Sequence, residues 1–81
     1  MFTVYILYST ELNKYYTGYT SLSVSDRLLQ HLYNLKGYTA KTKDWNVVYS
    51  KKIILKSNAL KFERKIKKRG AKRFMNETAS R

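Results

Sequence analysis

Tyrosine, arginine and histidine stand at positions from which they could act together on a phosphate ester. Tyr5 lies in the apolar run TVYIL and Tyr16 in the run YYTGYT, so a hairpin of these runs brings phenols side by side. Arg27 and His31 are four residues apart and would share one face of a helix. Phenols and imidazoles transfer protons, and a guanidinium binds phosphate through two parallel hydrogen bonds. Such a set of side chains suits phosphodiester hydrolysis.

Glu63 adds a carboxylate in an unexpected place. Ala59, Phe62 and Ile66 form the apolar stripe of a basic helical segment, and Glu63 falls inside that stripe. An unpaired buried carboxylate is costly or takes up a proton, so Glu63 needs a cation beside it. The spacing leaves two partners open, a lysine or arginine of the chain or a metal ion. A lone carboxylate can hold one Mg²⁺ that keeps most of its waters and binds phosphate oxygens.

The elements that must position these residues follow from the periodicity of the sequence. Residues 2–9, 15–20 and 46–55 are rich in β-branched and aromatic residues, which predicts three strands, the first two joined by a turn at Asn13. Helical spacing predicts helices over 21–37 and over 56–70, the second capped by Ser57 and ended by Gly70, and the tail adds a short third helix. We therefore expect one α+β domain over residues 1–81, with a three-stranded antiparallel sheet, two or three helices and the order β-β-α-β-α(-α).

The first predicted helix has its apolar stripe at Val24, Leu28 and Leu35. His31 falls within the stripe and Arg27 lies at its edge. Taken singly, His31 is typical of a packed core histidine and Arg27 of a solvated helix residue. Together, at the margin of a core, they favour the rim of a site.

The charge of the chain predicts a polyanionic partner. Lysine and arginine number 17 against 5 acidic residues, a formal net charge of +12. Repulsion of this size opposes compaction, and nucleic acid is the partner that most often offsets it, ahead of an anionic membrane surface. The basic residues that we expect to contact phosphates are Lys41, Lys43, Lys67, Lys68, Arg69, Lys72 and Arg73.

Two features that the sequence lacks bear on the cellular location of the protein. The chain has no cysteine, so disulfides and thiolate metal sites are excluded and a reducing cytoplasm is the expected location. It also has no long apolar stretch, so we expect no membrane span.

Four motifs together resemble the GIY-YIG nuclease domain, in particular its small free-standing bacterial members. Thr3-Val4-Tyr5 corresponds to the first tripeptide and Tyr16-Thr17-Gly18 to the second, and RLLQH and a glutamate in a basic helix follow. The first tripeptide lacks its glycine and the second its isoleucine, changes that affect strand packing rather than the chemistry. The resemblance covers nearly the whole chain.

The resemblance implies a metal-dependent endonuclease acting on DNA. Tyr5 or Tyr16, directly or through His31, would help to deprotonate the attacking water, and Arg27 would stabilise charge on the phosphate. Glu63 would hold one Mg²⁺, for which Mn²⁺ could substitute, and Asn76 is a further candidate site residue. The alternative is a nucleic-acid-binding module of the same fold with little or no cleavage, and a protein that directs the domain is a second kind of partner.

Overall fold

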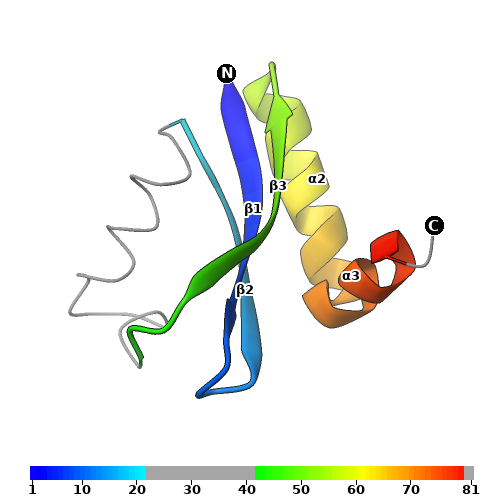
Figure 1. The fold of residues 1–81 in the computed structure, drawn as a ribbon. Coiled ribbons are helices and arrows are strands. Elements are labelled where there is room, and N and C mark those ends of the chain that lie inside the picture. Colours follow the sequence, from blue (N-terminus) through cyan, green and yellow to red (C-terminus); the bar gives the residue numbers. More distant parts are fainter. Residues whose placement is uncertain (22–41, 80–81) are drawn as a thin grey trace.

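A computed structural model gives the fold, and it describes residues 1–21 and 42–79. Strand β1 spans Phe2–Ser9, β2 Lys14–Thr20 and β3 Asn46–Ile53, and helices α2 and α3 span Lys56–Arg69 and Ala71–Ala79. The sheet is antiparallel with β1 at its centre, in the order β2-β1-β3. The expected α+β class and three-stranded sheet are confirmed, whereas the helix expected over 21–37 falls outside the described residues from position 22 onward (Figure 1).

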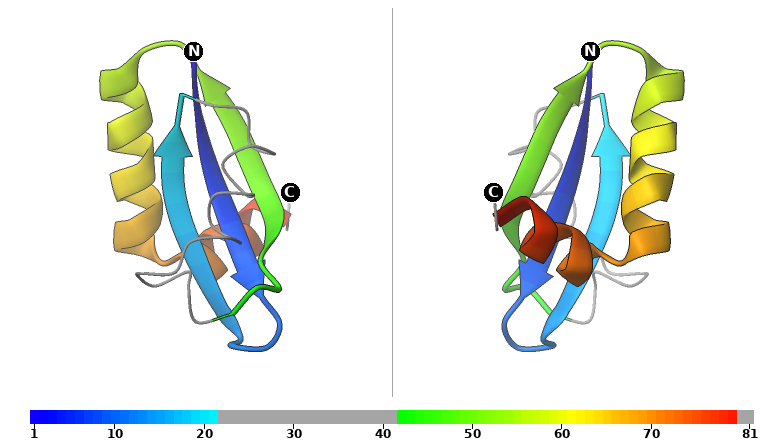
Figure 2. Two further views of the ribbon diagram at one scale, coloured as in Figure 1. Left: turned by 90° about the vertical axis from the view of Figure 1, so that its left-hand side faces the viewer. Right: turned by 90° about the vertical axis from the view of Figure 1, so that its right-hand side faces the viewer.

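Both helices lie on one face of the sheet. Figure 2 shows α2 running along the β2 side of that face, with α3 crossing below it toward β3. Val4 and Ile6 of β1 are fully buried against Ala59 and Ile66 of α2 in the larger core cluster. Aromatic side chains from the outer strands and from both helices complete this cluster, which we call the helix-side core.

The opposite face carries a second, smaller cluster. Tyr5 and Leu7 of β1 alternate with Val4 and Ile6, so they point away from α2 and pack with Trp45. A β-bulge in β3 supports this arrangement, because Ile6 pairs with Tyr49 and Leu7 with Val47, which leaves Val48 as the extra residue. Val47 therefore packs beside Leu7 on one face, while Tyr49 packs in the helix-side core on the other.

The ends of the elements follow local chemistry, with one correction to the predicted caps. Asn13 adopts a left-handed conformation in the hairpin turn, as its type predicts. Gly70 ends α2 with a positive φ of 93°, and its N–H donates to the carbonyl of Ile66. The prediction that Ser57 caps α2 is wrong. The helix already begins at Lys56 after an extended Leu55, so Ser57 lies within its first turn and no side chain caps it.

The third strand is shorter than predicted, because it ends at Ile53 rather than at residue 55. Ile54 and Leu55 are exposed in the bend that leads into α2. Their apolar character resembles that of a strand, but the chain has to leave the sheet there to return across its face. In the part of the chain that the structure describes, no helix has the length and apolar character needed to cross a membrane.

Candidate active site

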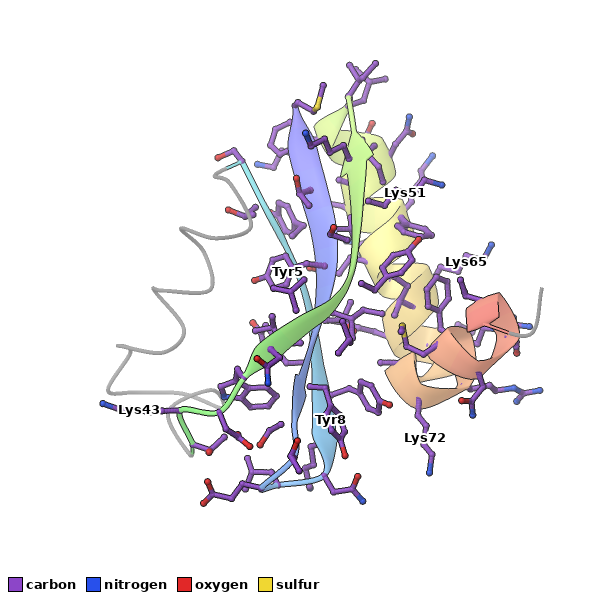
Figure 3. All side chains as sticks on the ribbon, viewed as in Figure 1. Tyr5, Tyr8, Lys43, Lys51, Lys65 and Lys72 are labelled. Carbon is purple, nitrogen blue, oxygen red and sulfur yellow. The ribbon has the colours of Figure 1, made fainter. Side chains whose placement is uncertain are left out.

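The hairpin places Tyr5 and Tyr16 on the same face of the sheet. Tyr5 pairs with Gly18 across the two strands, and Tyr16 precedes Gly18 by two residues, so both tyrosines project to the face away from α2. Both belong to the cluster that contains Leu7 and Trp45. Tyr5 is buried, with 1% of its surface exposed, and Tyr16 is half-buried. Figure 3 shows Tyr5 on the side of β1 opposite to α2.

Gly18 makes room for the two rings to approach each other. A Cβ atom at this position would lie 2.6 Å from the Tyr5 hydroxyl, 2.8 Å from Cζ of the same ring and 3.2 Å from Cε1 of Tyr16. The Tyr5 ring therefore crosses directly over the glycine, with the edge of the Tyr16 ring beside it. Any residue with a side chain at position 18 would displace the Tyr5 phenol.

The other tyrosines of the two strands have packing roles. Tyr15 and Tyr19 alternate with Tyr16 and contribute to the helix-side core. The Tyr8 ring packs against that of Tyr15 in a tilted arrangement, with 4.8 Å between centroids, and the Tyr8 hydroxyl donates to Asn13 Oδ1 at 2.6 Å. The tyrosines of the hairpin therefore form two groups. Tyr5 and Tyr16 lie on the face away from α2, which we call the site face, and the others pack on the helix side.

Glu63 lies on α2, with 13% of its side chain exposed, in agreement with its place in the apolar stripe. Its Oε1 is 3.5 Å from Nζ of Lys67, one turn later, and the Lys67 side chain is 55% exposed. Among the residues that the structure describes, Lys67 is the partner of this carboxylate, which is the lysine alternative that the sequence left open. An i,i+4 pair with one exposed member is weak, about 0.3–0.5 kcal/mol.

A groove of about 540 Å³ lies at the edge of the sheet, and neither Tyr5 nor Glu63 is among the residues that line it. Its walls come from the edge strand β2 and from the junction of α2 and α3, and its lining residues are Tyr15, Tyr16, Thr17, Lys67, Gly70, Ala71 and Lys72. Since Tyr15 and Tyr16 point to opposite faces, the groove runs around the edge of β2. It brings the Tyr16 side chain and the Lys67 partner of Glu63 to the same opening, and we call it the β2-edge groove.

Glu63 is the predicted metal ligand among the described residues, and it would act as a single carboxylate. Within residues 1–21 and 42–79, no three histidine, cysteine, aspartate or glutamate side chains gather as metal ligands. Mg²⁺ is commonly bound by one or two carboxylates together with water and substrate phosphates, and Glu63 offers an oxygen donor of that kind. Lys67 Nζ lies 3.5 Å from Oε1 of this carboxylate and would compete with an ion for it.

Asp44 holds together the end of the site face, a role that the sequence did not reveal. Its Oδ1 accepts from the hydroxyl of the fully buried Ser9 at 2.5 Å, and its Oδ2 accepts from the Glu11 N–H at 2.8 Å. The Thr42 hydroxyl lies 2.9 Å from Asp44 Oδ1 and 2.8 Å from Glu11 Oε2. The Ser9 hydrogen bond, followed by that of Glu11, lowers the pKa of Asp44 below its usual 3.8. The residue thereby ties the turn after β1 to the segment entering β3.

The structure divides the predicted phosphate contacts between two sides of α2. Lys67 and Lys72 line the β2-edge groove. Lys68, Arg69 and Arg73 line a second groove together with Lys65, which was not among the predicted phosphate contacts.

The remaining predicted site residues line neither groove or lie outside the described residues. Lys43 is exposed shortly before β3, and Asn76 is exposed on α3 and lines neither groove. Arg27, His31 and Lys41 lie outside the described residues.

Comparison with known protein families agrees with the paired tyrosine motifs. The family model described as the GIY-YIG catalytic domain matches residues 1–77 of the 81 in the chain. No curated protein and no solved structure matches the chain significantly. Family membership implies nuclease-type activity on nucleic acid. With two tyrosines beside Gly18 on one face of the sheet and a match along nearly its whole length, this chain belongs to the GIY-YIG family.

Proposed function

We propose that the protein is a metal-dependent endonuclease that hydrolyses phosphodiester bonds in DNA. The observation that carries the proposal is the meeting of Tyr5 and Tyr16 over Gly18, next to a groove that also exposes Lys67, the partner of Glu63. A packing role alone does not require two phenols to converge over a glycine. The family match gives the reaction class independently.

The two tyrosines differ in access, which suggests different roles. Tyr16 lines the β2-edge groove, so its hydroxyl is the one that we assign to contact with the phosphate or the attacking water. Tyr5 is buried behind it and would position Tyr16 or pass a proton on. A phenol has an ordinary pKa near 10, so proton transfer at neutral pH needs a neighbouring positive charge.

Arg27 and His31 complete the proposed set on the strength of the family motif. Arg27 would place a guanidinium against the phosphate and stabilise the charge that develops there. His31 would relay a proton between a phenol and the attacking water.

Glu63 is the residue that would hold Mg²⁺, or Mn²⁺ in its place. The bound ion would supply positive charge for the oxygens of the scissile phosphate. Lys67 would then release the carboxylate and turn its ammonium group toward the substrate backbone. Its exposed, weakly paired side chain permits that change.

Phosphate contacts outside the site would come from the basic residues. Lys67 and Lys72 already line the β2-edge groove, and Lys41 and Lys43 precede β3. We further propose a cytoplasmic location, in keeping with the absence of cysteine.

A second function, binding of nucleic acid without cleavage, is favoured by one specific observation. The Glu63–Lys67 ion pair satisfies the carboxylate within the chain, and a carboxylate retained by a lysine would bind no metal. The fold and the basic surface would serve such a module equally well.

Incubation with a panel of labelled nucleic acids separates the two functions. Single-stranded, duplex and branched DNA and RNA are each incubated with the purified full chain in Mg²⁺, in Mn²⁺ and in EDTA. The endonuclease predicts internal cleavage of DNA with either metal and none in EDTA. Retention of every substrate intact, with binding in all three conditions, would instead establish the binding module.

A further inference from the structure

A second basic groove lies on the far side of α2 from the β2-edge groove. Lys65, Lys68, Arg69 and Arg73 line about 430 Å³ in the angle between α2 and α3. Lys65 and Arg69 also line an adjoining groove of about 350 Å³ that reaches Tyr49 and Lys51 on β3. Figure 3 shows Lys51 and Lys65 on the helix side of the sheet and Tyr5 on the opposite side. We call these two adjoining hollows the α2–α3 groove.

The cations of this groove repel one another within the chain. Lys65 lies three residues before Lys68 and four before Arg69, so all three share one face of α2, where like charges are destabilising. Glu77 is the acidic residue among the lining side chains of the two hollows. An anion bound in the groove would relieve this repulsion.

Glu77 orients the two arginines of the groove. Its Oε2 accepts from Nε of Arg69 at 2.7 Å, and its Oε1 lies 3.3 Å from Nε of Arg73. Both contacts engage the Nε atoms, which fixes the plane of each guanidinium group beside Glu77. Those groups supply the paired donors that match a phosphate.

Aromatic rings continue the groove from the cations toward β3. Tyr49, Phe62 and Phe74 line it, with Tyr49 and Phe74 in edge-to-face contact at 5.2 Å between centroids. Lys51 Nζ lies 5.1 Å from the centroid of the Phe62 ring. Cations beside partly exposed rings are the composition of surfaces that bind single strands, where phosphates meet the charges and unpaired bases stack on the rings.

We propose that the α2–α3 groove binds a single-stranded segment of nucleic acid outside the site of cleavage. The proposal rests on the proposed function because it takes nucleic acid as the partner. It adds that the nucleic acid bound in this groove is single-stranded. Phosphates would contact Lys65, Lys68 and the two oriented arginines, and an unpaired base would stack at the aromatic end. Because α2, about 10–12 Å across with its side chains, separates the two grooves, one substrate would reach both only by passing around the helix.

Fluorescence anisotropy with a labelled oligothymidylate tests this groove without requiring catalysis. The probe is about six nucleotides long, within the roughly 4–16 nucleotide range of single-strand sites. The full chain is compared with K65Q/K68Q and with the control K56Q/K61Q, which removes the same charge from exposed positions of the same helix that line neither groove. Binding is measured over a salt series, and circular dichroism verifies the fold of each variant.

The groove variant should lower the slope of log affinity against log salt by roughly 1.4, about 0.7 for each lost contact. The control variant should change the slope by less than half of that amount. An abasic oligomer of equal length should bind the native chain about fivefold more weakly or worse, because stacking contributes about 1–3 kcal/mol per base.

Equal effects of the two double variants would overturn the groove, since charge alone would then explain binding. Equal affinity for a duplex of the same length, or for the abasic oligomer, would overturn the single-strand assignment. These binding measurements do not depend on cleavage. If the native chain cleaves no nucleic acid, the proposed function fails, but the groove can still be tested, so the two failures are distinguishable.

Discussion

The two faces of the central strand differ in what their side chains do. On the helix side, Val4 and Ile6 are covered by aliphatic and aromatic side chains of α2 and α3. On the other face, Tyr5 and Leu7 lie with Tyr16 and Trp45, and Gly18 leaves space for a phenol. The comparison shows that the position of a tyrosine on the hairpin decides its role, because alternation sends neighbouring tyrosines to different surroundings.

The largest expected difference between the faces is in catalysis. Tyr16→Phe should lower the cleavage rate by roughly 10² or more, because a positioned proton-transfer group contributes about 10²–10⁴. Tyr19→Phe is the matched control, since Tyr19 packs in the helix-side core and its hydroxyl has no hydrogen-bond partner among the described residues. Single-turnover cleavage of labelled DNA measures both rates. Equal rates for the two variants would remove the functional distinction between the faces.

Gly18→Ala should disturb the site face by steric overlap. The added Cβ would lie 2.6 Å from the Tyr5 hydroxyl, and the buried ring has little room to move. Overpacking of this kind typically costs about 1–3 kcal/mol of unfolding free energy. Denaturant unfolding measures the loss, and Tyr5→Leu in the same background should recover part of it. A penalty that stays the same without the ring would show that Tyr5 is not the cause.

Asp44→Asn should weaken the junction at the end of the site face in a pH-dependent way. In asparagine an amide nitrogen can replace the oxygen that accepts from the Glu11 N–H. Two hydrogen-bond donors would then face each other, and that hydrogen bond would be lost. Because the pKa of Asp44 is lowered from 3.8, its charge stabilises the fold fully above pH 3.8, and this contribution is lost as pH falls through the lower folded value.

Thermal unfolding of the native protein and the Asp44 variant over a pH series checks this expectation. The difference in stability should be largest near neutral pH and should shrink below pH 3.8. The pKa of Glu77 is also lowered, chiefly by the hydrogen bond from Arg69, and this change is common to both proteins, so it cancels in the difference. A difference that does not change with pH would contradict a role for the Asp44 charge.

The smallest expected effect concerns the ion pair on the helix. Lys67→Met should change the unfolding free energy by less than about 0.5 kcal/mol, because the pair is an i,i+4 contact with a half-exposed lysine. Chemical denaturation provides the value. A loss above about 2 kcal/mol would mean that Glu63 depends on Lys67 as a buried charge, and the interpretation of Glu63 as a structural ion-pair partner would gain support.

Local patterns were sufficient to predict most of the described fold. The β-branched and aromatic residues of Phe2–Ser9 predicted the bounds of β1 correctly, and Gly70 marked the end of α2 because a positive φ suits glycine. Ser57 misled because its type favours a cap, whereas the bend at Ile54 and Leu55 sets where the helix begins. The bulge at Val48 has no local signal, since it arises from pairing with β1.

The candidate site was predictable only in part. Spacing indicated that Tyr5 and Tyr16 would be neighbours, but their approach over Gly18 depends on the register of the hairpin. The role of Asp44 depends on contacts with Ser9 and Glu11, more than thirty residues away along the chain. The basic run was visible as charge, yet its division between two grooves follows from how α2 and α3 cross.

Glu63→Gln shows whether the Glu63 carboxylate takes part in the chemistry proposed at the β2-edge groove. The substitution keeps the size of the side chain and removes a charge suited to binding a divalent cation. Cleavage of labelled DNA is measured with Mg²⁺ at saturating protein, with DNA affinity and the circular dichroism spectrum as separate readouts. We expect cleavage to be abolished while folding and DNA binding are retained. Cleavage at the native rate would contradict it and leave Glu63 as the ion-pair partner of Lys67 alone.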